Sequence, residues 1–506
     1  MTTLSLASIL AEPAWRRPDK TALVEGGRRL TFAELWHQVL KQASALIGLG
    51  VRPGDPVALM CPNTTEFPRA YYAILAAGGV VVPVHLLLTA DEVATVLRDS
   101  GARLLIAHTG CAPAATAAAE HADVPVVTAG PDGRLEELTD RADPLPTFVT
   151  RKPEDPAVIF YTSGTTGTPK GAVLSHLNLV MNATVDAYDA REEIRRDDVV
   201  LASLPLFHTF GQTVSMNATW RVGATVVLLP RFDPDAAIAL MAEEAVTTFH
   251  GVPTMYLTLV EAAARAERLP KLRRCVSGGA SLPVPVLERF EAAFGAKVLE
   301  GYGLSETSPV ASVNQLMIGT KPGTVGHPLW GVDVEIADPD VVDAVKLLPR
   351  GELGEIVIRG HNVFTGYLNR PEETAAAVVD GWFRTGDLGR KDDEGFISIV
   401  DRTKDLIIRG GFNVYPREVE DVLLRMPGVT AAAVVGVPDE LHGEEIVAVV
   451  VSGEGVPSAD AILEYGKEHL GRHKYPRRVE FVEALPLGPS HKVLKRELRD
   501  RFGGAK

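Results

Sequence analysis

The chain has 506 residues, which is too long for a single hydrophobic core, so two or more domains are expected. A hydrophobic share of 46% and a charged share of 23% are ordinary for a soluble globular protein. The formal net charge of −14 argues against a general nucleic-acid binder, because duplex binding is carried by clustered cations that neutralise phosphates.

The cysteines and the apolar segments bear on the cellular compartment. Cys61, Cys111 and Cys275 lie far apart and form no CxxC pair, so neither a disulfide framework nor a zinc site is indicated. Residues 1–14 lack a cationic start followed by a long apolar stretch, so no secretory signal is visible. The most apolar segment, 73–88, is interrupted by glycine and proline and predicts a helix end feeding a buried strand. We therefore expect a cytoplasmic protein without an integral membrane segment.

Residues 4–140 alternate helical windows with short β-branched runs. The helical windows span 31–49, 64–77, 90–99 and 112–122, and the strand candidates span 57–60, 80–84, 104–107 and 124–127. Alternation of this kind is typical of a parallel sheet covered by helices.

An apolar run at 156–160 then leads into a loop rich in glycine, serine and threonine. The loop consists of Tyr161, Thr162, Ser163, Gly164, Thr165, Thr166, Gly167, Thr168, Pro169, Lys170 and Gly171. Hydroxyls are small donors, glycines let backbone N–H groups converge on an anion, and Lys170 adds a positive charge. A Walker loop needs four residues between its glycines, whereas Gly164 and Gly167 enclose two. The sequence therefore predicts a phosphate-binding loop of another kind.

The alternation resumes over 199–298. The strand candidates here span 199–203, 225–229, 247–250 and 274–277, and each ends near Gly, Pro, Ser or His. Ligands of open α/β sheets bind outside the carboxyl ends of the strands. Four polar or glycine-rich segments are therefore expected to converge on a cleft: 204–208, 250–253, 277–280 and 300–307.

After about Gly323 the pattern changes to short alternating strands, at 332–336, 354–359 and 396–400, which predict a smaller β-rich subdomain. Residues 386–389, Gly-Asp-Leu-Gly, read on their own as a turn. The charged run 401–405 interrupts a strand-like stretch, and we place the domain boundary there.

Four motifs in this order resemble those of the acyl-adenylate-forming enzymes, the superfamily of acyl-CoA synthetases, adenylation domains and beetle luciferases. They are the loop 161–171, the run 301–307 (Gly-Tyr-Gly-Leu-Ser-Glu-Thr), the stretch 381–387 (Gly-Trp-Phe-Arg-Thr-Gly-Asp), and 401–405 (Asp-Arg-Thr-Lys-Asp) through 413–416 (Asn-Val-Tyr-Pro). The resemblance covers nearly the whole chain, which looks most like a bacterial fatty-acid–CoA ligase.

The resemblance implies an α/β fold in two domains. Residues 1–401 would form a large N-terminal domain of helix-covered mixed sheets with the β-rich subdomain at about 323–400. Residues 402–506 would form a small mobile α+β C-terminal domain.

The implied reaction joins a carboxylic acid, medium- or long-chain fatty, to coenzyme A (CoA). The carboxylate attacks the α-phosphate of ATP to give acyl-AMP and pyrophosphate, and the CoA thiol then displaces AMP. Charge builds on phosphate oxygens during the first step, so the site needs preorganised donors, a divalent cation and a mobile lysine. Mg²⁺ is the expected cation, because oxygen donors are its usual partners.

By the same resemblance, most ATP contacts come from two regions of the chain. The β- and γ-phosphates would be held by Thr162, Ser163, Gly164, Thr165, Thr166, Gly167 and Lys170. The adenine would be framed by Gly279, Ala280, Glu300, Gly301, Tyr302 and Gly303, with Tyr302 stacked on it. Glu306 would ligate magnesium, with Thr162 as a second candidate ligand, and Thr307 would bond the α-phosphate.

The remaining implied roles belong to single residues. Asp387 would accept hydrogen bonds from both ribose hydroxyls, since a carboxylate has two oxygens, and Arg402 would assist at the ribose or a phosphate. Lys404 falls at the family's hinge, about which the C-terminal domain would swing to bring Lys492 into the site for adenylation. His208 resembles the family's residue beside the carboxylate entrance.

One departure from the family precedes the final helix. Family members usually carry Ser-Gly-Lys there, whereas this chain has Ser490, His491 and Lys492. Glycine adopts positive φ and allows close approach to a ligand, and histidine resists the first and blocks the second. We expect His491 to slow adenylation or to change how Lys492 enters the site.

Two other functions stay open. One is an acyl-AMP ligase that loads a carrier protein instead of CoA, and the other is a non-catalytic nucleotide-binding homologue. The second has only His491 in its favour. It is opposed by the presence of Lys170, Glu306, Asp387, Arg402 and Lys492.

The acyl group is the least determined part of the prediction. The segments expected to line its tunnel, 207–216, 250–256, 277–280 and 310–313, contain few charges, which favours an apolar acid. Gln212 stands where long-chain relatives often have a gating tryptophan. The expected partners are the acid, ATP and CoA, with no nucleic acid, and a homodimer is left open.

Overall fold

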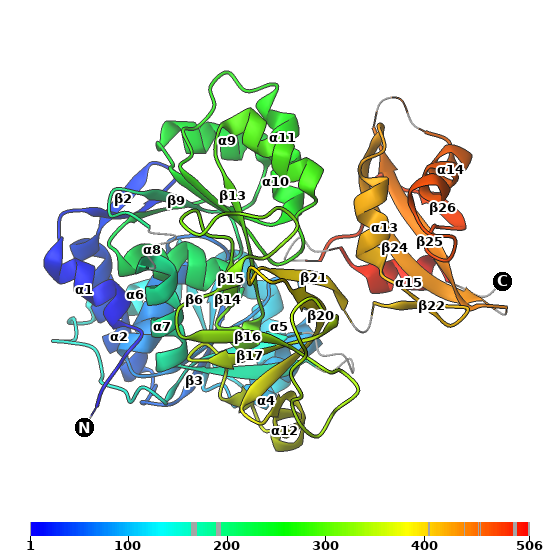
Figure 1. Ribbon diagram of the computed structural model, residues 1–506. Coiled ribbons are helices and arrows are strands. Elements are labelled where there is room, and N and C mark those ends of the chain that lie inside the picture. Colours follow the sequence, from blue (N-terminus) through cyan, green and yellow to red (C-terminus); the bar gives the residue numbers. More distant parts are fainter. Residues whose placement is uncertain are drawn as a thin grey trace.

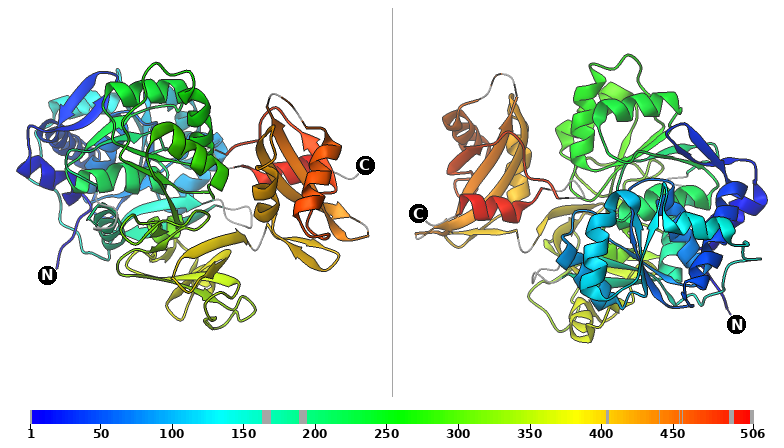
Figure 2. Two further views of the ribbon diagram at one scale, coloured as in Figure 1. Left: turned by 45° about the horizontal axis from the view of Figure 1, so that its top comes forward. Right: turned by 180° about the vertical axis from the view of Figure 1, so that it is seen from behind.

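The computed structural model describes residues 2–162, 169–188, 194–402, 405–439, 441–453, 455, 457–488 and 493–503. The chain forms a large body of two helix-covered sheets, a β-rich subdomain attached to it, and a C-terminal domain that stands to one side in every view (Figures 1 and 2). The predicted α/β fold is thereby confirmed. None of the helices in the described part of the chain is both long and apolar enough to cross a membrane.

A seven-stranded sheet carries the predicted phosphate loop. Its order is β18-β8-β7-β4-β3-β5-β6, with a parallel core and with β8 and β18 antiparallel at one edge. Its strands are β3 (Pro56–Met60), β4 (Val80–Pro83), β5 (Leu104–His108), β6 (Val126–Ala129), β7 (Pro156–Thr162), β8 (Lys170–Ser175) and β18 (Gly366–Tyr367). Every residue of β4 is buried, as expected for a parallel strand that is covered on both faces.

A nine-stranded sheet packs beside the first, in the order β15-β14-β13-β12-β11-β9-β10-β1-β2. Strands β13 to β1 in this order are parallel, and β15, β14 and β2 are antiparallel additions at the edges. The strands are β1 (Thr21–Glu25), β2 (Arg28–Thr31), β9 (Val199–Ala202), β10 (Thr225–Leu228), β11 (Thr248–Gly251), β12 (Arg274–Ser277), β13 (Val298–Gly303), β14 (Val310–Val313) and β15 (His327–Pro328).

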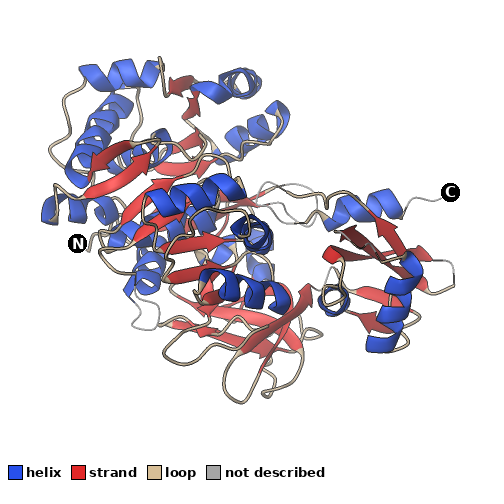
Figure 3. Ribbon diagram, turned by 90° about the horizontal axis from the view of Figure 1, so that it is seen from above, coloured by secondary structure: helices blue, strands red, loops and turns tan. Residues whose placement is uncertain are grey.

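Helices surround both sheets, as Figure 3 shows in blue around the red strands. They are α1 (Ser8–Arg16), α2 (Phe32–Gly48), α3 (Glu66–Ala76), α4 (Ala90–Ser100), α5 (Ala112–Ala122), α6 (Arg134–Arg141), α7 (His176–Tyr188), α8 (Ala218–Arg221), α9 (Pro234–Glu243), α10 (Pro253–Ala263) and α11 (Val284–Phe294), with short turns η1 (Thr109–Cys111) and η3 (Ser305–Thr307) and a π-helix η2 (Phe210–Asn217). Helices α2 and α4 each begin with a threonine capping box, Thr31 with Glu34 and Thr89 with Glu92. The predicted helices and strands of both sheet regions are confirmed, with bounds shifted by at most two residues.

The β-rich subdomain differs from its prediction in detail. Its strands are β16 (Val332–Ala337), β17 (Gly354–Gly360), β19 (Val378–Val379), β20 (Trp382–Lys391) and β21 (Ile397–Arg402), with α12 (Pro371–Ala377) beside them. Residues 386–389 lie inside β20 and not in a turn, because Leu388 and Gly389 pair with both β17 and β21. Strand β21 continues to Arg402, through the first two residues of the charged run. The predicted start near Gly323 is also early, since β15 still belongs to the nine-stranded sheet.

The C-terminal domain is a five-stranded sheet with helices on both faces. Its elements are β22 (Ile407–Arg409), β23 (Phe412–Val414), α13 (Pro416–Leu423), β24 (Val429–Asp439), β25 (Gly443–Ser452), α14 (Ala459–His469), β26 (Arg478–Phe481) and α15 (Lys495–Phe502). Alternate residues of β24 belong to different clusters: Val434 packs with Val419 and Ile462, whereas Val435 packs with Leu498. Because neighbouring side chains of a strand point to opposite faces, α13 and α14 cover one face and α15 covers the other.

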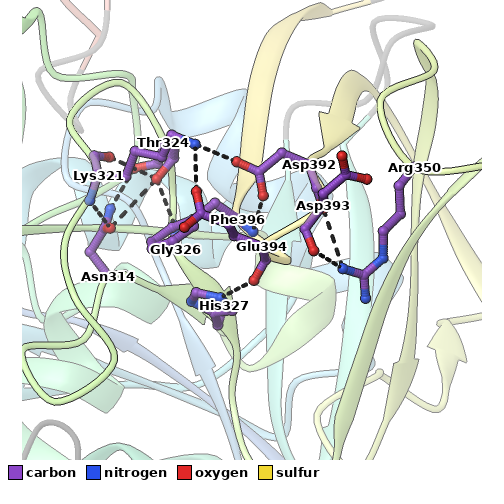
Figure 4. Close-up of polar contacts among 10 residues, drawn as sticks. All are labelled: Asn314, Lys321, Thr324, Gly326, His327, Arg350, Asp392, Asp393, Glu394 and Phe396. Carbon is purple, nitrogen blue, oxygen red and sulfur yellow. Dashed lines mark hydrogen bonds and ion pairs between the residues drawn. The ribbon is translucent and has the colours of Figure 1, made fainter.

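The β-rich subdomain is fixed to the nine-stranded sheet at the turn between β20 and β21 (Figure 4). Val325 and Gly326 exchange backbone hydrogen bonds with Ile397, of 2.7 and 2.9 Å. The His327 ring lies 4.3 Å from that of Phe396, and Lys321 pairs with Asp392 at 2.6 Å. The ion pair between Lys321 and Asp392 is substantially exposed, and exposed ion pairs contribute little to stability. The backbone bonds and the ring contact therefore hold this junction.

Gly326 is the position where this junction tolerates no side chain. Its φ is +69°, and a Cβ there would lie 2.0 Å from the Val313 carbonyl oxygen. Gly351 also has positive φ, at +82°, but has nothing within 4 Å of such a Cβ. We expect Gly351→Ala to cost about 1–2 kcal/mol through backbone strain alone, and Gly326→Ala to cost clearly more. Urea unfolding of both variants checks this, and equal losses would contradict the steric explanation.

Candidate active site

A cavity of 1580 Å³ opens where the carboxyl ends of the parallel strands meet the β-rich subdomain. Three of the four predicted segments contribute to its wall, namely those at 204–208, 277–280 and 300–307. The expected contribution of residues 250–256 is wrong, since none of these described residues lines the cavity. His250 is fully buried in β11, where its ring contacts Ser215 and Arg274.

The base of the predicted phosphate loop lies in this wall. Thr162 ends β7 and Lys170 begins β8, and the two residues face each other in the antiparallel register. Both line the cavity. The Lys170 ammonium lies 5.3 Å from the centroid of the Tyr367 ring, a cation–π distance. Residues 163–168, including Ser163, Gly164, Thr165, Thr166 and Gly167, lie outside the described residues.

Glu306 is held in the wall by a tyrosine that the sequence motifs did not mark. The Tyr367 hydroxyl donates to Glu306 Oε1 at 2.9 Å. Burial, followed by the Glu306 charge, raises the pKa of Tyr367, so that this hydroxyl keeps its proton and stays a donor. Tyr367 lies in β18, which pairs with β8. This pairing brings Tyr367 to the base of the phosphate loop, although the two segments are far apart in the sequence.

The same corner fits a magnesium ion. Glu306 is only 8% exposed yet lines the cavity, and Thr162 lines it as well. Mg²⁺ is usually bound by one or two protein oxygens together with substrate phosphates. These two oxygen donors beside Lys170 therefore match what the ion requires.

Asp387 joins three parts of the fold beside the cavity. One carboxylate oxygen accepts from the Tyr302 hydroxyl of β13 at 2.6 Å, and the other accepts from Arg402 Nε of β21 at 2.8 Å. The charge of Asp387 raises the pKa of Arg402, and burial followed by that charge raises the pKa of Tyr302. Tyr302 and Arg402 line the cavity, and the Asp387 carboxylate lies behind them.

Two histidines lie in the cavity wall near Phe207. His208 Nδ1 accepts from the Phe210 N–H at 3.2 Å, which leaves its other ring nitrogen as a donor in the neutral form. His85, which the sequence did not mark, lies with its ring 4.6 Å from that of Phe207. Burial lowers the pKa of His85 to about 4, so it is neutral at pH 7. Both histidines line the cavity.

The predicted site residues thus divide into three groups. Those in the wall are Thr162, Lys170, His208, Gly279, Gly301, Tyr302, Gly303, Glu306 and Arg402. Those described but not in the wall are Ala280, which is exposed, and Glu300, Thr307 and Asp387, which are buried. The Thr307 hydroxyl is fully buried and accepts from the Leu304 N–H at 2.8 Å, so it caps its own turn. The roles predicted for the second group stay predictions.

The third group lies outside the described residues and consists of the loop residues 163–167 together with Lys404, His491 and Lys492. Leu494, two residues beyond Lys492, is nevertheless part of the cavity wall. The end of the chain therefore comes to the same cavity as the phosphate loop.

Glu300 has the most perturbed carboxyl group near the site. It is 2% exposed, and its Oε1 accepts from the Leu282 N–H at 2.9 Å. Burial raises its pKa to about 7 from 4.5, against the opposing charge of Arg417, while Asp421 raises it further. The carboxyl group is thus a structural element next to the site rather than part of its surface.

The raised pKa makes stability depend on pH. The folded protein binds the Glu300 proton more tightly than the unfolded chain does. The contribution of this proton to the free energy of unfolding is therefore fully present below about pH 4.5 and is lost as the pH rises towards 7, a loss on the order of 3 kcal/mol. Glu300→Gln should remove this loss, and its melting temperature should exceed that of the wild type at pH 8 but not at pH 4.5. The exposed Glu288→Gln serves as control, and a wild-type slope in the Glu300 variant would contradict the assignment.

Comparisons with known proteins agree with this geometry. The chain matches the family model described as AMP-binding enzyme over residues 10–368, and the AMP-binding enzyme C-terminal domain over residues 418–492. It is 36% identical to a long-chain-fatty-acid–CoA ligase of Bacillus subtilis (strain 168), over 98% of this chain and 94% of the relative. It is 38% identical to a feruloyl-CoA synthase of Amycolatopsis sp, over 99% of this chain and all of the relative.

A solved structure shares the whole architecture. The crystal structure of ATP-bound MatB from Rhodopseudomonas palustris superposes with a TM-score of 0.90 at 36% identity, covering 98% of this chain and 99% of that one. With both family models matched and these relatives covered from end to end, the chain belongs to the AMP-binding enzyme family, within the acyl-adenylate-forming superfamily that its motifs predicted and in the class of AMP-forming acyl-CoA ligases.

Proposed function

We propose that this protein joins a medium- or long-chain fatty acid to CoA through an acyl-AMP intermediate, with release of AMP and pyrophosphate. The observation that carries the proposal is that one cavity joins a phosphate end, with Lys170 and Glu306, to an apolar end. The apolar end is lined by Phe210, Val214, Val276, Val310 and Val313. A nucleotide and an apolar acid can therefore meet inside a single cavity.

The nucleotide is held along the wall between these ends. Lys170, with the loop residues before it, binds the β- and γ-phosphates, and Thr307 the α-phosphate. Gly279, Ala280 and Glu300 to Gly303 frame the adenine, and Tyr302 stacks on it. Asp387 binds the ribose hydroxyls, because a carboxylate that already serves Tyr302 and Arg402 still has lone pairs to offer.

Glu306 and Thr162 hold Mg²⁺, which neutralises charge on the phosphates when bound. Tyr367 orients the Glu306 carboxylate through its 2.9 Å hydrogen bond. His208 donates to the carboxylate of the acid and directs it at the α-phosphorus. These groups are preorganised, and preorganised donors are the main source of catalysis in transfer to phosphorus.

The reaction proceeds in two balanced steps. An oxygen of the acid forms a bond to the α-phosphorus while the bond from that phosphorus to pyrophosphate breaks. Lys492, brought in by the C-terminal domain that turns about Lys404, stabilises the charge on the transferring phosphate. The sulfur of CoA then bonds to the acyl carbon, the acyl–oxygen bond to AMP breaks, and the thiol proton leaves to solvent.

The identity of the acid rests on the apolar end of the cavity. Five apolar side chains favour an acid with an apolar body. The fatty-acid ligase of Bacillus subtilis supports a fatty acid, whereas the feruloyl-CoA synthase supports an aryl acid of similar apolar character. Gln212, at the predicted gate position, is fully buried and donates to the Leu206 carbonyl oxygen at 3.3 Å. Cytoplasmic location and assembly as a homodimer remain predictions.

The direct test is a panel of acids from short to long chain, together with aryl acids, incubated with ATP, Mg²⁺ and CoA. We expect release of AMP and formation of a thioester that both depend on the acid, with the highest kcat/KM for medium or long chains. AMP release that needs no CoA, with transfer to a carrier protein, would favour the carrier-loading alternative. No acid-dependent release of pyrophosphate would favour a non-catalytic homologue.

Lys492→Ala separates the two steps. It should lower the rate of acyl-AMP formation by at least about 100-fold, the usual effect of removing one charge-stabilising donor, and leave thioester formation from supplied acyl-AMP within about threefold. Lys467→Ala is the control, because Lys467 is an exposed lysine of the same domain that pairs only locally, with Glu464. Equal losses in both steps would contradict the role of Lys492.

A further inference from the structure

An ion pair is buried at the apolar end of the cavity. Asp186 of α7 and Arg274 of β12 lie 3.7 Å apart, with side chains 3% and 2% exposed. Asp186 is part of the cavity wall, whereas Arg274 is not. An apolar pair of the same size would often be as stable as a buried ion pair, so this pair calls for an explanation other than stability.

The strand geometry places this pair at the inner end of the cavity. Ser277 and Val276 of β12 line the cavity at the carboxyl end of the strand, and Arg274 lies two residues deeper on the face of Val276. Helix α7 closes the same region, since the side chain of Asn182 bonds to both backbone groups of Val310. An acid that extends from the phosphate end along the apolar wall would therefore approach Asp186.

A histidine completes the network without adding charge. Arg274 Nη1 lies 3.0 Å from His250 Nε2, and His250 Nδ1 lies 3.2 Å from the Ser215 hydroxyl. Arginine can only donate, so Nε2 is the acceptor and Nδ1 carries the hydrogen. Burial, followed by the charge of Arg274, lowers the pKa of His250 well below its ordinary value, which agrees with a neutral ring. Among the described residues of this network, Asp186 therefore carries a negative charge, Arg274 carries a positive charge, and the His250 ring is neutral.

We propose that Asp186 screens Arg274 and thereby excludes acids that carry a second negative charge at their far end. The proposal deepens the proposed function, on which it rests, by naming the class of acid: monocarboxylates with an uncharged distal end. A distal carboxylate would approach Asp186 before Arg274, and like charges in contact cost several kcal/mol. An acid with an uncharged distal end meets no such repulsion, because the charges of Asp186 and Arg274 balance each other. Selectivity thus comes from a repulsive group that lies between the substrate and an attractive one.

The test replaces Asp186 by its neutral isostere. Asp186→Asn removes the negative charge beside the buried Arg274, for which the distal carboxylate of a substrate becomes the natural partner. With hexanoate, octanoate and decanoate against hexanedioate, octanedioate and decanedioate, we expect the ratio of kcat/KM for the diacid to that for the monoacid to rise by about 10-fold or more. A ratio within about twofold of wild type, in a variant that melts like wild type, would overturn the proposal.

Two further variants test whether the charge of Arg274 causes the shift. Arg274→Met removes the cation beside Asp186, so the diacid ratio should fall below that of wild type. Asp186→Asn with Arg274→Met removes both charges, and the gain of the single Asp186 variant should disappear. If Asp186→Asn fails to fold, the Arg274 variant decides: a lower diacid ratio supports the proposal, and an unchanged ratio overturns it.

The matched control is a second buried carboxylate next to β12. Asp198 is 2% exposed and accepts from Arg273 Nε at 3.2 Å, but it does not line the cavity. Asp198→Asn therefore loses a buried ion pair without changing the charge near the acid, and its diacid ratio should stay that of wild type. If the diacid ratio rose equally in Asp198→Asn, the effect would come from a general loosening of the structure, and the proposal would be overturned.

A binding measurement separates this proposal from the proposed function. Titration calorimetry of octanoate and octanedioate against the full-length wild type and Asp186→Asn measures the ratio of the two affinities without any turnover. If the wild type forms no thioester with any acid, the proposed function fails, and the calorimetric ratio still tests the screening by Asp186. If thioester forms but neither ratio shifts, the screening fails and the proposed function stands.

Discussion

The Asp387 carboxylate is the constraint on which the arrangement of the site depends. A buried carboxylate is costly unless both oxygens are satisfied, and here one is bonded to Tyr302 and the other to Arg402. The three residues come from the nine-stranded sheet, the middle of β20 and the last residue of β21. This carboxylate therefore attaches the β-rich subdomain to the large body at a second place, besides the junction at Gly326, and it lies beside the point from which the C-terminal domain departs (Figure 1).

The cavity beside this carboxylate is polar at one end and apolar at the other. At the polar end, Lys170, Tyr367 and Glu306 are linked by a cation–π contact and a hydrogen bond, so the phosphate loop and the proposed metal ligand are set relative to each other. At the apolar end, Val276 and Val310 precede the buried charges of Asp186 and Arg274. The first end is suited to ATP, a substrate of the family, and we propose that the second distinguishes one acid from another.

The sequence predicted the fold well, and its motifs marked residues that the structure brings together in one cavity wall, because both depend on local signals. Alternating helix and strand patterns predicted the two sheets, and contiguous motifs marked Thr162, Lys170, Tyr302 and Glu306. Contacts between distant segments left no such signal. Tyr367 reaches Glu306 only because β18 pairs with β8, and His250 turns away from the cavity because it bonds Arg274. The turn expected at 386–389 is a strand because sheet pairing overrides the local preference of glycine.

The central claim is that the acid is activated as acyl-AMP before CoA attacks. The most direct measurement uses the acid with both carboxylate oxygens labelled with ¹⁸O, in the presence of ATP, Mg²⁺ and CoA, followed by mass spectrometry of the products. If the carboxylate attacks the α-phosphorus, one labelled oxygen appears in AMP and the other stays in the thioester. Unlabelled AMP, or label in inorganic phosphate together with ADP, would contradict the account.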